Sequence, residues 1–186
     1  GKGNGVEQIF PDAEQVAQIR NENMYCTVIR LQYGEFTYYT GGDVFGKPHP
    51  DTPWQDIESA IADVVGPVDV VVANHHAYSD AMFDNFIKAT RPQVFIIPVW
   101  DYYHPQPEPL ARMLSKSLYP VERMVFAAGM VKSNRERLAA DGEAIKPDGH
   151  VVVRVYPGGD EFQVFVLNDR SEKYEVLYQT DKLSSK

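Results

Sequence analysis

Short strand-like segments that alternate with amphipathic ones are the feature that most limits how this chain can fold. Residues 68–73 are apolar around the single Asp69, residues 93–99 form a second apolar run, and a third strand is expected over residues 121–127. Continuous apolar runs of this kind are typical of strands that are buried on both faces. Strands that alternate with helices pair in parallel through right-handed crossovers. The pattern therefore predicts a parallel sheet covered by helices.

The helices between these strands have recognisable ends. The first is expected to begin at Thr52, which can cap it, and to end before Gly66. The second has Ser79 as a candidate cap, and a third covers residues 107–118. A short fourth helix is expected over residues 134–140.

Two segments predict β-hairpins, one on each side of the strand–helix repeat. Residues 25–33 and 36–40 are joined by a tight turn at Gly34, and residues 151–156 and 162–167 are joined by a Pro-Gly-Gly-Asp turn. We therefore expect an α/β fold with a mixed sheet, a parallel centre and β-hairpins at both ends.

The 186-residue length suits one domain. We expect a polar lead-in over residues 1–23, a domain over residues 24–180, and a disordered tail over residues 181–186. The first residues are Gly-Lys-Gly-Asn-Gly without an initiator Met, which favours a segment cut from a longer protein.

The composition excludes some classes of function. The formal net charge of −8 argues against non-specific binding to a nucleic-acid backbone, which needs clustered Lys and Arg. No apolar stretch reaches membrane-spanning length. Cys26 is the only cysteine, so an internal disulfide is impossible and the redox compartment stays undetermined.

Polar side chains follow three of the predicted strands. Asp43 comes after the first hairpin, His75 and His76 follow the first apolar run, and Asp101 and His104 follow the second. Ligands of open α/β sheets bind outside the carboxyl ends of the strands, so we expect these side chains to face a common cleft. Asp and His that converge in space are typical metal ligands.

Each of these residues also has an ordinary structural explanation. Asp43 can be a turn former, and His75 and His76 can be a hydrogen-bonded pair at a strand end. Their joint position after three strands favours a site. The chain has no H-x-H-x-D-H or H-E-x-x-H cluster, so it falls short of the three protein ligands of a catalytic zinc ion.

The order and spacing of four motifs resemble a known family. The chain reads Tyr-Gly-Glu-Phe-Thr-Tyr-Tyr-Thr-Gly-Gly-Asp at 33–43, Val-Asp-Val-Val-Val-Ala-Asn-His-His-Ala-Tyr-Ser at 68–79, Arg-Pro-Gln-Val-Phe-Ile-Ile-Pro-Val at 91–99, and His-Pro at 104–105. This series resembles the second half of the metallo-β-lactamase superfamily, nearest the hydrolase domain of bacterial DNA-uptake competence proteins. The resemblance covers roughly residues 6–120.

The resemblance implies half of an αββα sandwich and a metal-dependent hydrolase with two zinc-type ions. Asp43 would be the metal-bridging carboxylate, and either His75 or His76 would be the last histidine ligand. His104 would line the substrate pocket, and Asp101 and Ser79 are the further candidates for substrate binding. The bond cleaved would be an ester, a phosphodiester or a related bond, in a bacterial protein that is cytoplasmic or exported.

Two departures accompany the resemblance. The chain has a second Gly before Asp43, and it has Ala77 where the family has Gly. The metal-binding motif of the family's first half is absent, so this chain alone is expected to bind metal weakly.

Two partners are expected: the N-terminal half of the same protein, or a second copy in a homodimer that buries the hairpin at residues 25–40. The alternative function is a metal-free, non-catalytic α/β domain that uses the same loops to bind a ligand or partner.

Overall fold

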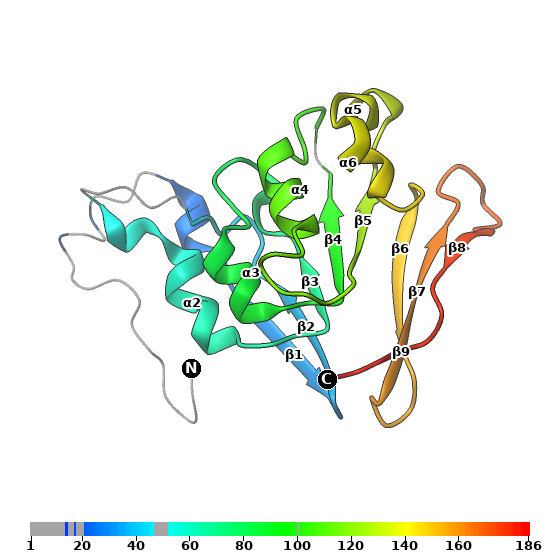
Figure 1. Cartoon of the computed structure of the whole chain (residues 1–186), viewed down its shortest axis with the longest axis horizontal. Coiled ribbons are helices and arrows are strands. Elements are labelled where there is room, and N and C mark those ends of the chain that lie inside the picture. Colours follow the sequence, from blue (N-terminus) through cyan, green and yellow to red (C-terminus); the bar gives the residue numbers. More distant parts are fainter. Residues whose placement is uncertain (1–13, 15–16, 18–20, 47–51, 100) are drawn as a thin grey trace.

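Two sheets and one layer of helices make up the fold (Figure 1). The structure is a computed structural model that describes residues 14, 17, 21–46, 52–99 and 101–186. The lead-in expected at residues 1–23 lies mostly outside the described residues. The mixed α/β class predicted from the sequence is confirmed.

Sheet A holds the expected parallel centre. Its strands, in spatial order, are β1 (Ile29–Tyr33), β2 (Phe36–Thr40), β3 (Val70–Val72), β4 (Val94–Pro98) and β5 (Met124–Ala128). β1 and β2 form the antiparallel hairpin, and β2 to β5 run parallel. The helical elements are η1 (Glu22–Tyr25), η2 (Pro53–Gln55), α2 (Ile57–Val65), η3 (Asn74–Ala77), α3 (Asp84–Thr90), α4 (Pro107–Leu114), α5 (Lys132–Arg137) and α6 (Ala139–Ala144).

Both faces of sheet A are covered, which explains its apolar strands. On one face, Val71 and Phe95 belong to the core shared with α2, α3 and α4. On the other face, Val70 and Val94 belong to a second core, shared with sheet B. The layers are therefore helices, sheet A and sheet B.

The C-terminal hairpin does not extend sheet A but begins sheet B. Sheet B contains β6 (His150–Val155), β7 (Glu161–Leu167), β8 (Val176–Gln179) and β9 (Leu183–Ser184). Every second residue of β7 is buried, at Phe162, Val164 and Val166. This apolar face packs on sheet A, so the hairpin adds a layer and not an edge.

Residues 181–186, expected to be a disordered tail, are instead built into the base of the molecule. β9 pairs with the start of β7. The Ser184 carbonyl accepts a hydrogen bond from Gln93 Nε2 (2.8 Å), and the backbone N–H of Lys186 donates to the buried Asp69 (3.1 Å). The sequence did not reveal this pairing because a two-residue strand carries too short a pattern.

Two helix starts differ from those predicted. Thr52 makes no side-chain cap, and α2 begins at Ile57 with Asp56 accepting from the Ser59 N–H (3.0 Å). Ser79 does not cap α3, which begins at Asp84. The backbone N–H groups of Met82 and Phe83 donate to the buried side chain of Glu58, which keeps residues 78–83 in a loop.

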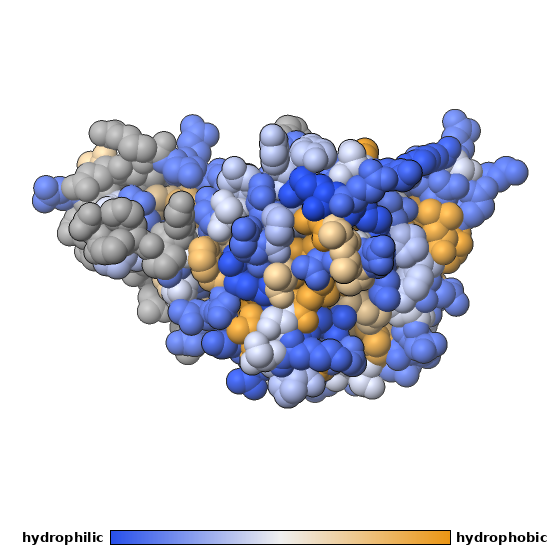
Figure 2. Space-filling model, turned by 45° about the horizontal axis from the view of Figure 1, so that its top comes forward, coloured by the Kyte–Doolittle hydropathy of each residue, from blue (hydrophilic) through white to orange (hydrophobic). Residues whose placement is uncertain are grey.

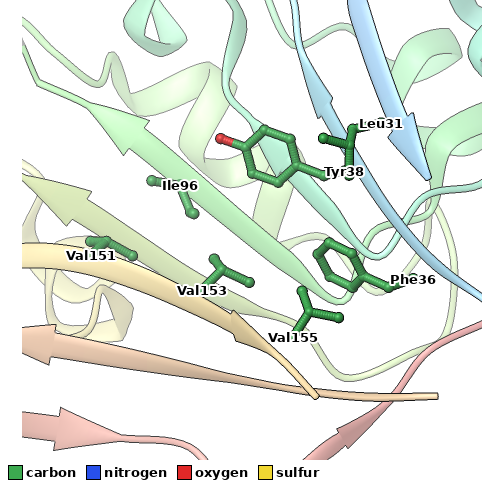
Figure 3. A pocket seen from close by; sticks show the side chains of 7 residues that line it. All are labelled: Leu31, Phe36, Tyr38, Ile96, Val151, Val153 and Val155. Carbon is green, nitrogen blue, oxygen red and sulfur yellow. The ribbon is translucent and has the colours of Figure 1, made fainter. Parts of the chain in front are cut away.

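The sandwich is incomplete on one side. A groove of about 320 Å³ lies between β6 and the β1–β2 end of sheet A. Its apolar lining consists of Leu31, Phe36, Tyr38, Ile96, Val151, Val153 and Val155 (Figure 3). All five residues of β1 are exposed, so sheet B leaves this end of sheet A without a second layer. No helix among the described residues is long and apolar enough to cross a membrane.

Candidate functional site

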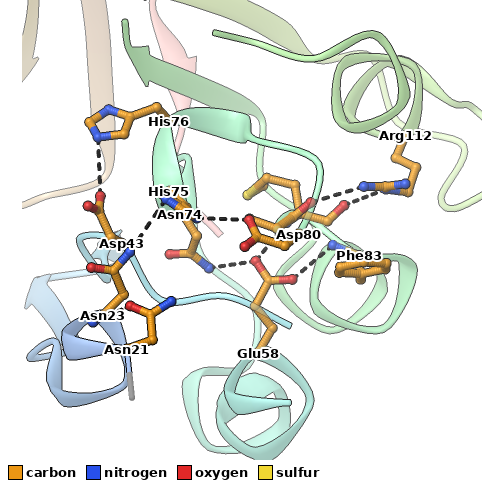
Figure 4. Close-up of polar contacts among 12 residues, drawn as sticks. Asn21, Asn23, Asp43, Glu58, Asn74, His75, His76, Asp80, Phe83 and Arg112 are labelled. Carbon is orange, nitrogen blue, oxygen red and sulfur yellow. Dashed lines mark hydrogen bonds and ion pairs between the residues drawn. The ribbon is translucent and has the colours of Figure 1, made fainter. Parts of the chain in front are cut away.

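The structure places Asp43 beside His76 of the histidine pair. The loops after β2, β3 and β4 lie at the carboxyl edge of sheet A, because these strands run parallel. There His76 Nε2 lies 3.2 Å from Asp43 Oδ1 (Figure 4). Both side chains are partly exposed, at 22% for His76 and 37% for Asp43, so small molecules can reach them.

The hydrogen bonding of His76 fixes which ring nitrogen faces Asp43. Nδ1 lies 2.5 Å from the Pro98 carbonyl oxygen, which can only accept, so Nδ1 carries a hydrogen and donates. In the neutral ring, Nε2 then turns its lone pair toward the Asp43 carboxylate. His76 Nε2 and Asp43 Oδ1 would then both present lone pairs, and they attract each other only when a proton or a cation lies between them.

The separation between these two atoms fits one shared ion. Two ligand atoms that each lie ~2.1 Å from a tetrahedral ion are roughly 3.4 Å apart. A metal-binding His commonly donates its other ring N–H to a backbone carbonyl, which sets the tautomer and the ring orientation. His76, held by Pro98, therefore has the arrangement of a metal ligand, and Asp43 fits beside it.

His75 is arranged differently. Its Nδ1 donates to Asp80 Oδ1 (2.8 Å), and its Nε2 contacts Asn23 Nδ2 (3.4 Å). The hydrogen bond to Asp80 raises the pKa of His75 above its ordinary value, against a smaller opposing effect of burial. Because Nδ1 is bonded to Asp80 and Nε2 is in contact with Asn23 Nδ2, His75 is suited to orient its loop rather than to bind metal.

The backbone of the histidine loop is strained. His75, His76 and Ala77 all have positive φ, at 43°, 54° and 56°. A left-handed conformation costs roughly 1–2 kcal/mol for a residue other than Gly, so other contacts must hold these three residues in place. One of these contacts is the His75 N–H, which donates to the Gly42 carbonyl (3.0 Å) and ties the histidine loop to the Asp43 loop.

His104 joins the site through its ring. It is buried and stacks on His76 with ring centroids 4.9 Å apart, while Tyr78 packs against it edge-on at 5.5 Å. Burial lowers the pKa of His104, and the neighbouring His76 and His75 lower it further, although Asp101 opposes this shift. His104 is therefore neutral at neutral pH.

The other two predicted substrate-binding residues have local roles. Asp101 Oδ1 lies 3.6 Å from His104 Nδ1 and accepts from the Tyr103 N–H (2.7 Å), which shapes the loop after β4. Asn134 of α5 fixes the same loop by donating to the carbonyls of Asp101 and His104. Ser79 is exposed in the turn between Tyr78 and Asp80.

Sequence reasoning missed the residues that support the site. The most buried of them is Glu58, which is 0% exposed on α2. Position 58 lies three residues before Ile61 and four before Ala62, on the stripe that α2 buries. A charged residue on such a stripe is rarely buried without partners, and this position was the available signal.

Asp43 and His76 are fewer ligands than a catalytic metal needs. Among the residues that the structure describes, no group of three or more His, Cys, Asp and Glu side chains could hold a metal ion. Asp43 and His76 could therefore supply only some of the ligands of a metal ion.

Comparisons with known proteins give no independent assignment. No protein-family model matches the chain, and no curated protein matches it significantly.

Proposed function

We propose that this chain is the C-terminal part of a metal-dependent hydrolase of the metallo-β-lactamase superfamily. The observation that carries the proposal is the pair formed by His76 Nε2 and Asp43 Oδ1, with His76 Nδ1 bound to the Pro98 carbonyl. Asp43 and His76 would supply part of the ligands of a zinc-type ion or ion pair. When bound, such ions activate a water molecule and stabilise the negative charge that develops on an ester or phosphodiester.

The remaining side chains have defined parts in this proposal. Asp43 and His76 hold one side of the metal shell, and the His75–Asp80 pair fixes the loop that carries His76. His104 is neutral and stacks on His76. It would line the space where substrate binds and form one hydrogen bond with the substrate.

The open groove supports the second part of the proposal, the missing N-terminal half. β6 is an edge strand of sheet B, and beyond it no described strand or helix forms a second layer over Leu31 and Tyr38 of sheet A. A strand added to the free edge of β6 would cover these side chains and complete the sandwich. The N-terminal half would supply that layer together with the missing ligands.

The test is a Zn²⁺ titration followed through the ring nitrogens of the histidines by ¹⁵N NMR. We expect the signal of His76 Nε2 to move at millimolar Zn²⁺, and to stop responding in the Asp43→Asn variant. The matched control is Asp63→Asn, which removes one carboxylate from the exposed side of α2 and should leave the response of His76 in place. A wild-type His76 signal that ignores Zn²⁺ would overturn the proposal.

The groove also favours the second candidate function, a metal-free domain that binds a partner. Its lining is mainly apolar and includes no His, Cys, Asp or Glu side chain. In that case His76 would not respond to Zn²⁺, while changes to the groove would still alter self-association or partner binding.

A further inference from the structure

Glu58 is a buried carboxylate with three hydrogen-bond donors around it. Oε1 accepts from Asn74 Nδ2 (2.9 Å) and from the Met82 N–H (2.7 Å), and Oε2 accepts from the Phe83 N–H (2.9 Å). Figure 4 shows this carboxylate rising from α2 toward the segment that carries the histidines. Its bonds are therefore directed at the site and not at its own helix.

The three donors lie at the two ends of one segment. Asn74 directly precedes His75, while Met82 and Phe83 follow Asp80. Between these ends lie the three strained residues, two of which are the histidines. A single carboxylate thus closes the histidine loop at its beginning and at its end.

The same side chain also contacts the Asp43 loop. A Cβ placed on Gly46 would lie 2.6 Å from Glu58 Cβ and 2.8 Å from Oε2, so the backbone at Gly46 packs directly on Glu58. The Glu58 N–H donates to the Phe45 carbonyl (3.2 Å), and the Gly46 N–H donates to the Asp80 carbonyl (2.8 Å). Both loops of the site therefore meet at Glu58.

A second contact links the same two loops through Asn74. Tyr39 Oη donates to Asn74 Oδ1 (2.9 Å), and Gly41 packs against this bond, since a Cβ there would lie 2.2 Å from Oη. Asn74 thus connects Glu58 to Tyr39 on β2, the strand that precedes Asp43.

We propose that Glu58 is a positioning residue that sets the distance between Asp43 and His76 by anchoring both of their loops. This inference rests on the proposed function in one respect: Asp43 and His76 are taken as the metal-binding pair. Glu58 contacts neither of them and acts only through the backbone and Asn74.

The chemistry of the anchor requires two oxygen atoms that accept hydrogen bonds. All three partners donate, so both oxygens must accept. The variant Glu58→Gln keeps the volume but turns an NH₂ group toward a backbone N–H, and the histidine loop loses one of its end contacts.

The experiment compares Glu58→Gln with Asp63→Asn by ¹⁵N NMR of the histidine rings and by Zn²⁺ titration. Asp63 lies exposed on the same helix, so its variant removes the same charge without touching the loops. We expect Glu58→Gln to shift the ring-nitrogen signals of His76 without metal, and to weaken Zn²⁺ binding about tenfold, as loss of a residue that orients a ligand does. Asp63→Asn should change neither.

A folded Glu58→Gln variant with unchanged His76 ring signals would overturn the inference. If that variant does not fold, Asn74→Ala provides the second test, because it cuts the link to His75 while Glu58 keeps its two backbone donors. Unchanged His76 signals in Asn74→Ala would likewise overturn it. The metal-free signals separate the two proposals, since they test the anchor even if wild-type His76 ignores Zn²⁺.

Discussion

His75 and His76 are neighbours in the chain, yet their ring nitrogens have different partners. His75 faces a carboxylate that favours its protonated form, while His76 donates to a carbonyl and turns its second nitrogen to Asp43. The choice between the two histidines as ligand, which the sequence left open, therefore favours His76 on geometric grounds.

Replacing Asp80 by Asn should lower the pKa of His75, since the hydrogen bond to Asp80 is the main cause of its elevation. A raised histidine pKa stabilises the fold fully below the ordinary value of 6.5, and this contribution is lost as pH rises through the folded value. Histidine ring signals followed from pH 5 to 9 measure the change. An unaltered His75 titration in Asp80→Asn would contradict the assignment.

Glu58 should make the stability of the protein fall between pH 4.5 and about 7. Burial raises its pKa from 4.5 to about 7, and nearby Asp56 adds to the shift, whereas its three donors oppose it. In this pH window the folded protein keeps a proton that the unfolded chain has released, so the free energy of unfolding decreases as pH rises. Arg112 and Tyr39 are the other titratable groups coupled to Glu58.

Chemical denaturation of wild type and Glu58→Gln at several pH values tests this expectation. The free energy of unfolding of Glu58→Gln should depend less on pH between 4.5 and about 7 than that of the wild type. Asp80→Asn should instead reduce the pH dependence above 6.5. Identical profiles for wild type and Glu58→Gln would contradict the prediction.

At the scale of elements, the loops of the site depend on close packing against α2. Gly46→Ala should destabilise the protein by about 1–3 kcal/mol, because the new methyl group would overlap Glu58. It should also shift the ring signals of His76. Gly66→Ala is the matched control: position 66 has open space but a backbone conformation that is nearly restricted to Gly, so it should also cost about 1–3 kcal/mol and yet leave His76 unchanged.

Much of the element pattern could be predicted, and the exceptions have physical causes. The parallel strands and the meeting of Asp43 with His76 follow from apolar runs and strand ends, which are local signals. Glu58 looks like a solvated helix charge until its donors, 16 to 25 residues away, are known. The placement of β6 and β7 in a second sheet depends on tertiary packing that strand alternation alone does not specify.

At the scale of the whole molecule, the apolar groove and the exposed strand β1 need a cover. Ile29, Leu31 and Tyr33 are each about half exposed, and hydrophobic surface also appears at the right end of the face in Figure 2, where sheet B lies. Proteins rarely leave a long apolar edge strand open. We therefore expect this chain, studied alone, to form a homodimer through the hairpin.

Light scattering over a range of concentrations measures this association. A Lys at position 31 would place a charge on the apolar edge, so Leu31→Lys should shift the protein toward the monomer. A wild-type chain that stays monomeric at high concentration would contradict the expectation.

Removal of residues 181–186 should lower the free energy of unfolding by about 2–4 kcal/mol, since each hydrogen bond lost contributes about 1 kcal/mol. The deletion removes β9 and the contacts of Ser184 and Lys186. Thermal and chemical unfolding give the change. Stability equal to that of the full chain would mean that these contacts contribute nothing in solution.

The bond between Lys186 and Asp69 has a consequence for how the protein is made. Asp69 sits at the start of β3, in the middle of sheet A, and accepts from Thr37 and Gln93 before it meets Lys186. Asp69 and Lys186 are 117 residues apart in the chain. On a translating ribosome, sheet A and its helices can assemble early, but the base of the sandwich cannot close until residues 183–186 have emerged. Closure of the sandwich base is therefore a late step of folding, after sheet A and its helices.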